Sequence, residues 1–114
     1  MKDCIFCKII AGEIPSKKVY EDKKLFAFED INPQAPTHVL IVPKQHLETL
    51  LEISAAHSEL LGSIYVAANH IARKRGIAQS GFRVVANCNQ DAGQTVFHIH
   101  FHLLGGRVMA WPPG

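Results

Sequence analysis

The sequence of 114 residues contains no long apolar run, no extended block of like charge and no low-complexity tract. Because a secretory signal peptide and a membrane span each need a long apolar run, the sequence predicts neither of them. We therefore expect a cytoplasmic protein with no membrane partner. The formal net charge is only +2 at pH 7. The densest basic run, residues 73–75, ends an expected helix, where cations suit the helix dipole, so we expect no nucleic-acid partner.

Cysteine is scarce as well, with three residues in the chain. An odd number in a chain without an export signal favours free thiols or a metal site over a disulfide framework. Hydrophobic residues make up 47% of the sequence, which excludes a disordered composition. The length fits one domain over residues 1–114. The hydrophobic core of a domain this size gives only modest stability, so self-association would add to it.

Local patterns predict two helices and five strands. The apolar residues of 54–75 recur at helical spacing, with Ser54 able to cap the start and Gly76 suited to the end. A shorter helix is expected over residues 4–10. Strands are expected, between turn signals, over residues 18–21, 25–28, 37–42, 82–86 and 96–104. These elements predict an α+β domain, in which one long and one short helix cover a five-stranded antiparallel sheet.

The most informative segment is residues 97–104, in which histidines alternate with apolar residues. A strand would project His98, His100 and His102 from one face. The opposite face, expected to lie under the long helix, would carry Phe97, Ile99, Phe101 and Leu103. Three adjacent imidazoles suit no apolar core, because each needs hydrogen-bond partners. One interpretation is a metal cluster. Another is catalysis, with a neutral imidazole attacking phosphorus while its neighbours fix its tautomer and protonate a leaving group.

The run from His98 to Leu104 resembles the histidine-triad motif, His-φ-His-φ-His-φ-φ, where φ is apolar. Other stretches are similar to the nucleotide-binding (Hint) branch of that family, namely residues 5–10, 30–38, 93–95, 104–107 and 111–114. The resemblance spans nearly the whole chain and implies the HIT-like fold. It implies hydrolysis of purine nucleoside 5′-phosphoramidates of the adenosine type to AMP and an amine, through a covalent nucleotidyl-histidine. It also implies a homodimer in which the tail, residues 105–114, approaches the partner's site.

The resemblance implies a role for each matching residue. His100 would be the nucleophile, His102 would contact the phosphate and assist the leaving group, and His38 would support the nucleophile through its ring proton. His98, the first histidine of the triad, would belong to the same catalytic group. Asp30 would bind the ribose, although a turn aspartate before Asn32 is the alternative reading of the residues alone. The nucleotide contacts would come from Phe28, Asp30, Ile31, Asn87, Gly93, Gln94, Thr95, His100, His102 and Trp111. Departures from the branch pattern are Thr95 where serine is usual, Phe97 where tyrosine is frequent and Ala110 where some members carry histidine.

A zinc site is a further expectation from the resemblance. Some histidine-triad proteins bind structural zinc through residues that match Cys4, Cys7, His46 and His98. Two thiolates and two imidazoles suit a closed tetrahedral site. Catalysis would need no cofactor. The alternative is a pair of idle thiols, with His46 on the surface.

Two rival functions stay open. One is dinucleoside polyphosphate hydrolysis, the activity of the fragile-histidine-triad branch, against which the endings 104–107 and 111–114 argue. The other is a regulatory module that binds nucleotide or zinc and in which hydrolysis is incidental.

Overall fold

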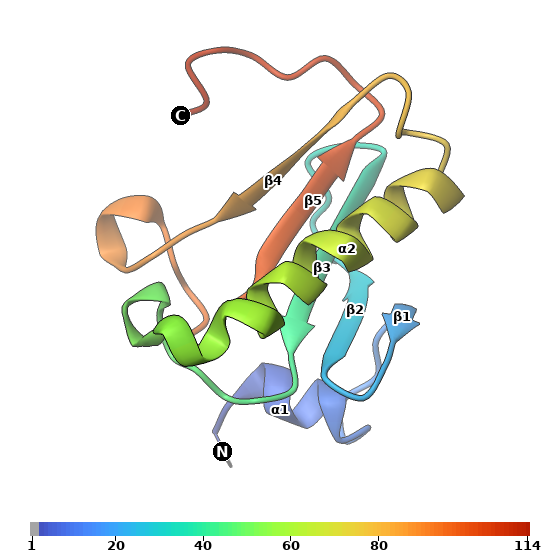
Figure 1. Ribbon diagram of the computed structural model, residues 1–114. Coiled ribbons are helices and arrows are strands. Elements are labelled where there is room, and N and C mark those ends of the chain that lie inside the picture. The colour runs from blue at the N-terminus through green and yellow to red at the C-terminus, as the bar shows by residue number, and fades with distance from the viewer. Residues whose placement is uncertain (1–2) are drawn as a thin grey trace.

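The computed structural model describes residues 3–114. Within that range, five antiparallel strands form one sheet in the order β1-β2-β3-β5-β4 (Figure 1). The strands are β1 (Lys18–Glu21), β2 (Leu25–Glu29), β3 (Thr37–Pro43), β4 (Phe82–Ala86) and β5 (Phe101–Gly105). The predicted α+β class and the five-stranded antiparallel sheet are therefore confirmed.

The helices are α1 (Ile5–Ile10) and α2 (Ser58–Lys74), and short 3₁₀ turns lie at 50–52, 55–57 and 90–92. The long helix begins later than the predicted Ser54. Ser54 instead caps the 3₁₀ turn Ala55–His57, where its hydroxyl accepts from the backbone and the His57 ring accepts from the Ser54 N–H. The capping signal was read correctly, but the first turn that it caps is 3₁₀ rather than α.

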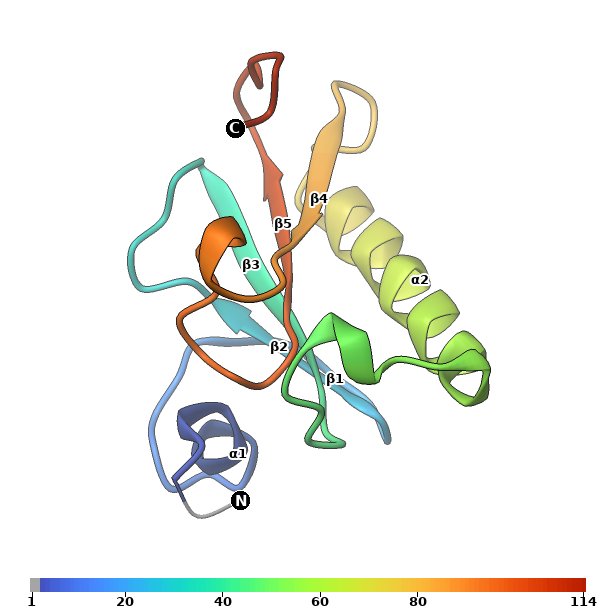
Figure 2. The same ribbon diagram turned by 90° about the vertical axis from the view of Figure 1, so that its left-hand side faces the viewer.

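The two helices lie on opposite sides of the sheet (Figure 2). Under α2, the core holds Leu25 and Ala27 of β2 together with Val39 and Ile41 of β3. Under α1, it holds the alternate residues of the same strands, Phe26, Phe28, Leu40 and Val42. Burial on both faces explains why residues 39–43 of β3 form a continuous apolar run instead of alternating. In the described range, no helix combines the length and the apolar character needed to span a bilayer.

The last strand is shorter than predicted. The sequence pattern extends over 96–104, but β5 begins at Phe101, and the chain bends at residues 96–98. The preceding segment is bonded to the loop after β3 instead of to a strand: the Ile99 N–H donates to the Leu47 carbonyl at 2.8 Å. Phe97 is 46% exposed and not packed under α2 as expected. Alternation resumes at Ile99, so Ile99, Phe101 and Leu103 enter the core beside α2.

Candidate active site and metal centre

The catalytic candidates gather on the α1 side of β3 and β5. His102 lies on β5 opposite Leu40 of β3, and His38 lies two residues before Leu40 on the same face. The ring centroids are 5.2 Å apart for His38 and His102, and 5.1 Å apart for His102 and His100. His38 is only 4% exposed, whereas His100 and His102 are half-buried. His100 comes from the bent segment just before the strand, so the strand repeat alone does not place it.

A backbone hydrogen bond fixes the tautomer of His100. Its Nδ1 lies 2.8 Å from the carbonyl oxygen of His98, which can only accept, so Nδ1 carries the proton. The unprotonated nitrogen of the neutral ring is then Nε2. The rings of Phe6 and His100 pack perpendicular to each other, at 5.0 Å between centroids and 88° between planes. His100 is thus held as a neutral imidazole with a free lone pair, the form that attacks an electrophile.

A chain of hydrogen bonds orients His102 in the same way. The Gln34 N–H donates to Nδ1 of His38 at 3.0 Å, so the proton of neutral His38 is on Nε2. That Nε2 lies 2.9 Å from Nδ1 of His102 and 3.3 Å from Oδ2 of Asp30. When it donates to His102, the Nε2 of His102 carries a proton that can be given away. His38 therefore contacts His102, and not the nucleophile as expected from the resemblance.

Burial keeps these imidazoles neutral. Desolvation lowers the pKa of His38, His98 and His100 below the ordinary 6.5. For His102, burial and then the charges of His100 and His38 lower the pKa to about 4. The Asp30 carboxylate opposes this effect at His38, His100 and His102 but does not outweigh it. At neutral pH, the site offers an unprotonated ring nitrogen on His100 and uncharged hydrogen-bond donors.

A cavity of about 620 Å³ lies beside the histidines and is of the size that small-molecule sites have. Three residues predicted to bind nucleotide, Phe28, Asp30 and Ile31, line it together with Ile9 of α1. Two contacts connect the cavity to the histidines. Asp30 reaches His38, and the Phe28 ring packs on Phe6 at 5.5 Å between centroids, which in turn packs on His100.

The other predicted nucleotide contacts lie outside this cavity. Thr95 lines a second cavity of about 380 Å³, beside Cys4 and His46. Both donors of the buried Gln94 amide are used within the protein, to the carbonyls of Glu48 and Val96, so it braces the loop. Gly93 ends the neighbouring 3₁₀ turn with a φ of +84°. Asn87 follows β4 and is half-buried, while Trp111 is 81% exposed.

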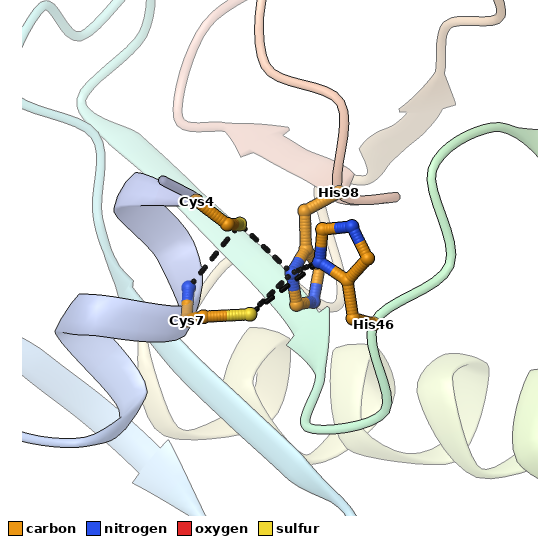
Figure 3. A group of neighbouring side chains, drawn as sticks. All are labelled: Cys4, Cys7, His46 and His98. Atoms are coloured by element: carbon orange, nitrogen blue, oxygen red, sulfur yellow. Dashed lines mark hydrogen bonds between the residues drawn. The ribbon is translucent and has the colours of Figure 1, made fainter. Parts of the chain in front are cut away.

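The four predicted zinc ligands converge on one point (Figure 3). Nδ1 of His98 lies 3.3 Å from Sγ of Cys4, 3.5 Å from Sγ of Cys7 and 3.1 Å from Nδ1 of His46. Sγ of Cys7 lies 3.4 Å from Nδ1 of His46. Metal bonds of about 2.0–2.3 Å in a tetrahedron place ligand atoms about 3.3–3.8 Å apart. The separations fit a tetrahedral zinc ion to within a few tenths of an ångström.

The tautomer of His98 also suits a metal. Its ring is fully buried, and Nε2 lies 2.7 Å from the Pro43 carbonyl oxygen, so Nε2 carries the proton and the Nδ1 lone pair faces the thiols. A second group, Asp30, His38 and His102, is equally compact but is arranged differently. The Gln34 N–H keeps the proton of His38 on Nε2, the atom that would have to bind a metal. The first group therefore has the donor chemistry of a metal site, and the second has the geometry of a proton relay.

Comparison with known proteins identifies the family of this fold and site. The family model described as the HIT domain matches residues 11–109. The chain belongs to the HIT domain family. It is 50% identical over 108 residues to a protein of Escherichia coli (strain K12) named purine nucleoside phosphoramidase. The alignment covers 95% of this chain and 91% of that protein. It is 53% identical over 112 residues to the 14 kDa zinc-binding protein of Zea mays, covering 96% of this chain and 87% of that protein.

Among solved structures, a HIT family hydrolase from Legionella pneumophila Philadelphia 1 superposes with a TM-score of 0.97 at 53% identity. The match covers 98% of this chain and 100% of that chain, which confirms the expected HIT fold. The site also contains residues that sequence reasoning missed. Phe6 of α1 packs on His100, and Ile9 lines the cavity. Their spacing of three on a helix places both on one buried face, which was the available signal.

Proposed function

We propose that this HIT protein hydrolyses purine nucleoside 5′-phosphoramidates of the adenosine type, releasing AMP and an amine through a nucleotide bonded to His100. The observation that carries the proposal is the hydrogen bond from Nδ1 of His100 to the His98 carbonyl. It leaves Nε2 unprotonated in a site whose burial lowers the pKa of this ring. The relative from Escherichia coli that is named purine nucleoside phosphoramidase supports the same substrate class.

The reaction has two displacements at phosphorus. In the first, the Nε2 lone pair of His100 attacks the α-phosphorus, and the P–N bond breaks with its electron pair going to the amine. The leaving nitrogen takes the Nε2 proton of His102, and Nδ1 of His102 accepts a stronger bond from His38. In the second, water attacks phosphorus, its proton goes to His102, and the bond to His100 breaks, so AMP leaves and the ring is restored.

The cavity supplies the nucleoside site in this proposal. Phe28, Ile31 and Ile9 offer apolar surface to a purine ring. Asp30 has one oxygen bonded to the Asn32 N–H and the other near His38, and a carboxylate keeps further lone pairs for ribose hydroxyls. Asn87, Gly93 and Thr95 are proposed as phosphate contacts that form with substrate, because glycine and a hydroxyl let donors approach an anion.

Zinc and self-association complete the proposal. Zinc held by Cys4, Cys7, His46 and His98 would fasten α1 to the sheet, and catalysis would need no cofactor. A homodimer is proposed because, among residues 3–114, β4 leaves one edge of the sheet unpaired and α2 exposes Tyr65 and Val66, at 50% and 68%. In that dimer, the tail with Trp111 would approach the partner's cavity. A cytoplasmic location stays a prediction.

The decisive experiment traps the intermediate. The protein is mixed with an adenosine phosphoramidate and quenched in alkali, where a phosphorus–nitrogen bond to histidine survives, and the adduct is mapped by mass spectrometry. We expect AMP on His100, no adduct in His100→Ala, and a normal adduct in the control His70→Ala, which changes an exposed histidine of α2. Turnover without an adduct on His100 would contradict the mechanism. Faster turnover of a diadenosine polyphosphate would favour the rival substrate.

A further inference from the structure

The helix α1 belongs to two sites at once. It has six residues, with Cys4 at its N-cap, where the thiol accepts from the Cys7 N–H at 3.4 Å. Between the two cysteines lies Phe6, and one turn further Ile9 lines the large cavity. A helix this short has no stability of its own in water, so tertiary contacts hold it in place. Those contacts are the cluster of thiols and imidazoles and the apolar residues under α1.

Two connections run from the metal cluster to the nucleophile. His98 places its ring in the cluster while its own carbonyl oxygen holds the Nδ1 proton of His100. Phe6 packs on both rings, at 6.0 Å from His98 and 5.0 Å from His100 between centroids. A shift of α1 or of the His98 ring therefore changes the wall of the cavity and the orientation of His100 together.

The thiols are open to solvent-borne reagents. Cys4 and Cys7 are each half-buried, and the cavity of about 380 Å³ is lined by Cys4 and His46. The sulfur atoms of Cys4 and Cys7 belong to the cluster with His46 and His98, in which all ligand atoms lie within 4.8 Å of one another. An oxidant can therefore reach one sulfur while the other is close enough to complete a bond. The third thiol, Cys88, lies outside this cluster.

We propose that Cys4 and Cys7 form a redox switch, in which oxidation to a disulfide by a hydroperoxide removes the metal site and weakens nucleotide binding. The inference rests on the proposed function, because the regulated site is the proposed nucleotide site. One thiolate attacks the outer oxygen of the hydroperoxide, which leaves a sulfenic acid and an alkoxide that takes a proton. The second thiolate attacks the sulfenic sulfur and displaces hydroxide, which becomes water. The sulfurs lose two electrons, and the hydroperoxide gains them.

The disulfide and the metal exclude each other for a geometric reason. A disulfide holds its sulfurs about 2.05 Å apart, whereas two thiolates on tetrahedral zinc are about 3.8 Å apart. Oxidation therefore draws both sulfurs away from His46 and His98, and α1 loses one of its two anchors. Loss of the packing of Phe6 and Ile9 removes apolar contact from the site, and we expect the Kd for AMP to rise by at least about tenfold.

The coupling is reciprocal, which gives a second readout. If the disulfide weakens AMP binding, then bound AMP must oppose disulfide formation by the same factor at equilibrium. Saturating AMP is therefore expected to shift the thiol–disulfide equilibrium toward the thiols by about tenfold in a glutathione buffer. An AMP-independent equilibrium would show that the two sites do not communicate.

The experiment uses the zinc-loaded, reduced protein and hydrogen peroxide. We would measure AMP affinity by calorimetry, zinc release with a chromogenic chelator and the Cys4–Cys7 crosslink by peptide mapping. Each measurement is repeated after dithiothreitol is added to reduce the protein and zinc is returned to it. We expect zinc release, the crosslink and weaker AMP binding to appear together and to be reversed together. The matched control is Cys88→Ser, which should respond as the parent does, whereas Cys7→Ser should show no peroxide-dependent change in AMP affinity.

Four results would overturn the proposal. These are a different crosslink, a Cys4–Cys7 crosslink with unchanged AMP affinity, a loss of affinity also in peroxide-treated Cys7→Ser, and loss of the cooperative thermal unfolding transition on oxidation. The last would mean that the whole domain unfolds rather than α1 alone. Failure of the proposed function is distinguishable, because the reduced protein would then bind no AMP before any oxidant is added.

Discussion

Removal of the His38 imidazole tests the proton relay most directly. In the structure, this ring is 4% exposed and makes two hydrogen bonds, one from the Gln34 N–H at 3.0 Å and one to Nδ1 of His102 at 2.9 Å. His38→Ala leaves both partners without a bond. It leaves the hydrogen bond of His100 to the His98 carbonyl in place. The nucleophile should therefore stay correctly oriented while His102 is released.

The expected magnitudes follow from those two bonds. A hydrogen bond contributes about 0.5–1.5 kcal/mol net, and both lost bonds are part-buried, so the free energy of unfolding should fall by about 1–3 kcal/mol. For a domain of this size, that corresponds to a melting temperature lower by several degrees. Without the His38 donor, His102 can place its proton on Nδ1, where it cannot reach the leaving group. We expect kcat to fall by about ten- to a hundredfold, within the range of lost general acid catalysis.

The assay combines kinetics and spectroscopy below the lowered melting temperature. Turnover of an adenosine phosphoramidate gives kcat, and nitrogen-15 shifts of the His102 ring give its tautomer. His38→Gln offers both an acceptor and a donor and should recover part of the lost rate, whereas His70→Ala should behave as the parent does. If His38→Ala lowered the melting temperature but left kcat within about twofold of the parent, the relay would not exist as described.

Four other predictions follow from the same geometry. His100→Ala should keep AMP affinity within about tenfold by calorimetry but lose nearly all turnover, because the nucleophile acts on the transition state; a large loss of affinity would indicate a structural role. Because burial lowers the pKa of His100 and brings that of His102 to about 4, kcat/KM should stay level as pH falls through 6.5 and decline only in more acidic solution. A midpoint at or above pH 6.5 would refute this. Elemental analysis should find about one zinc per chain, and much less in Cys7→Ser. Gly106→Ala should lower the free energy of unfolding by about 1–3 kcal/mol, because its φ is +94° and a Cβ would lie 2.9 Å from Pro36, whereas Gly62→Ala on α2 should raise it by about 0.5–1 kcal/mol.

Much of the fold follows from local patterns in the sequence. Periodic apolar residues predicted α2, and the fold class and sheet were predicted from turn signals and strand composition. The HIT resemblance then pointed to one set of residues for the nucleotide and another for zinc. Phe28, Asp30 and Ile31 do line one cavity, and the four zinc candidates do meet. The catalytic roles themselves stay predictions, to be tested as above.

The tertiary structure decided where the elements end and which residues from different elements contact one another. The alternation of residues 96–104 looks the same whether or not a neighbouring strand is present, and only the bond from Ile99 to Leu47 shows that β5 begins at Phe101. The sequence alone thus determined which residue types both sites contain and which face of β5 His102 occupies. Only the tertiary structure decided that His38 contacts His102, that the His98 ring turns to the cysteines while its carbonyl oxygen contacts His100, and that α1 packs against both sites. The reason is physical: periodicity is set by each residue's own backbone, whereas hydrogen-bond partners and tautomers depend on segments brought together from distant parts of the chain.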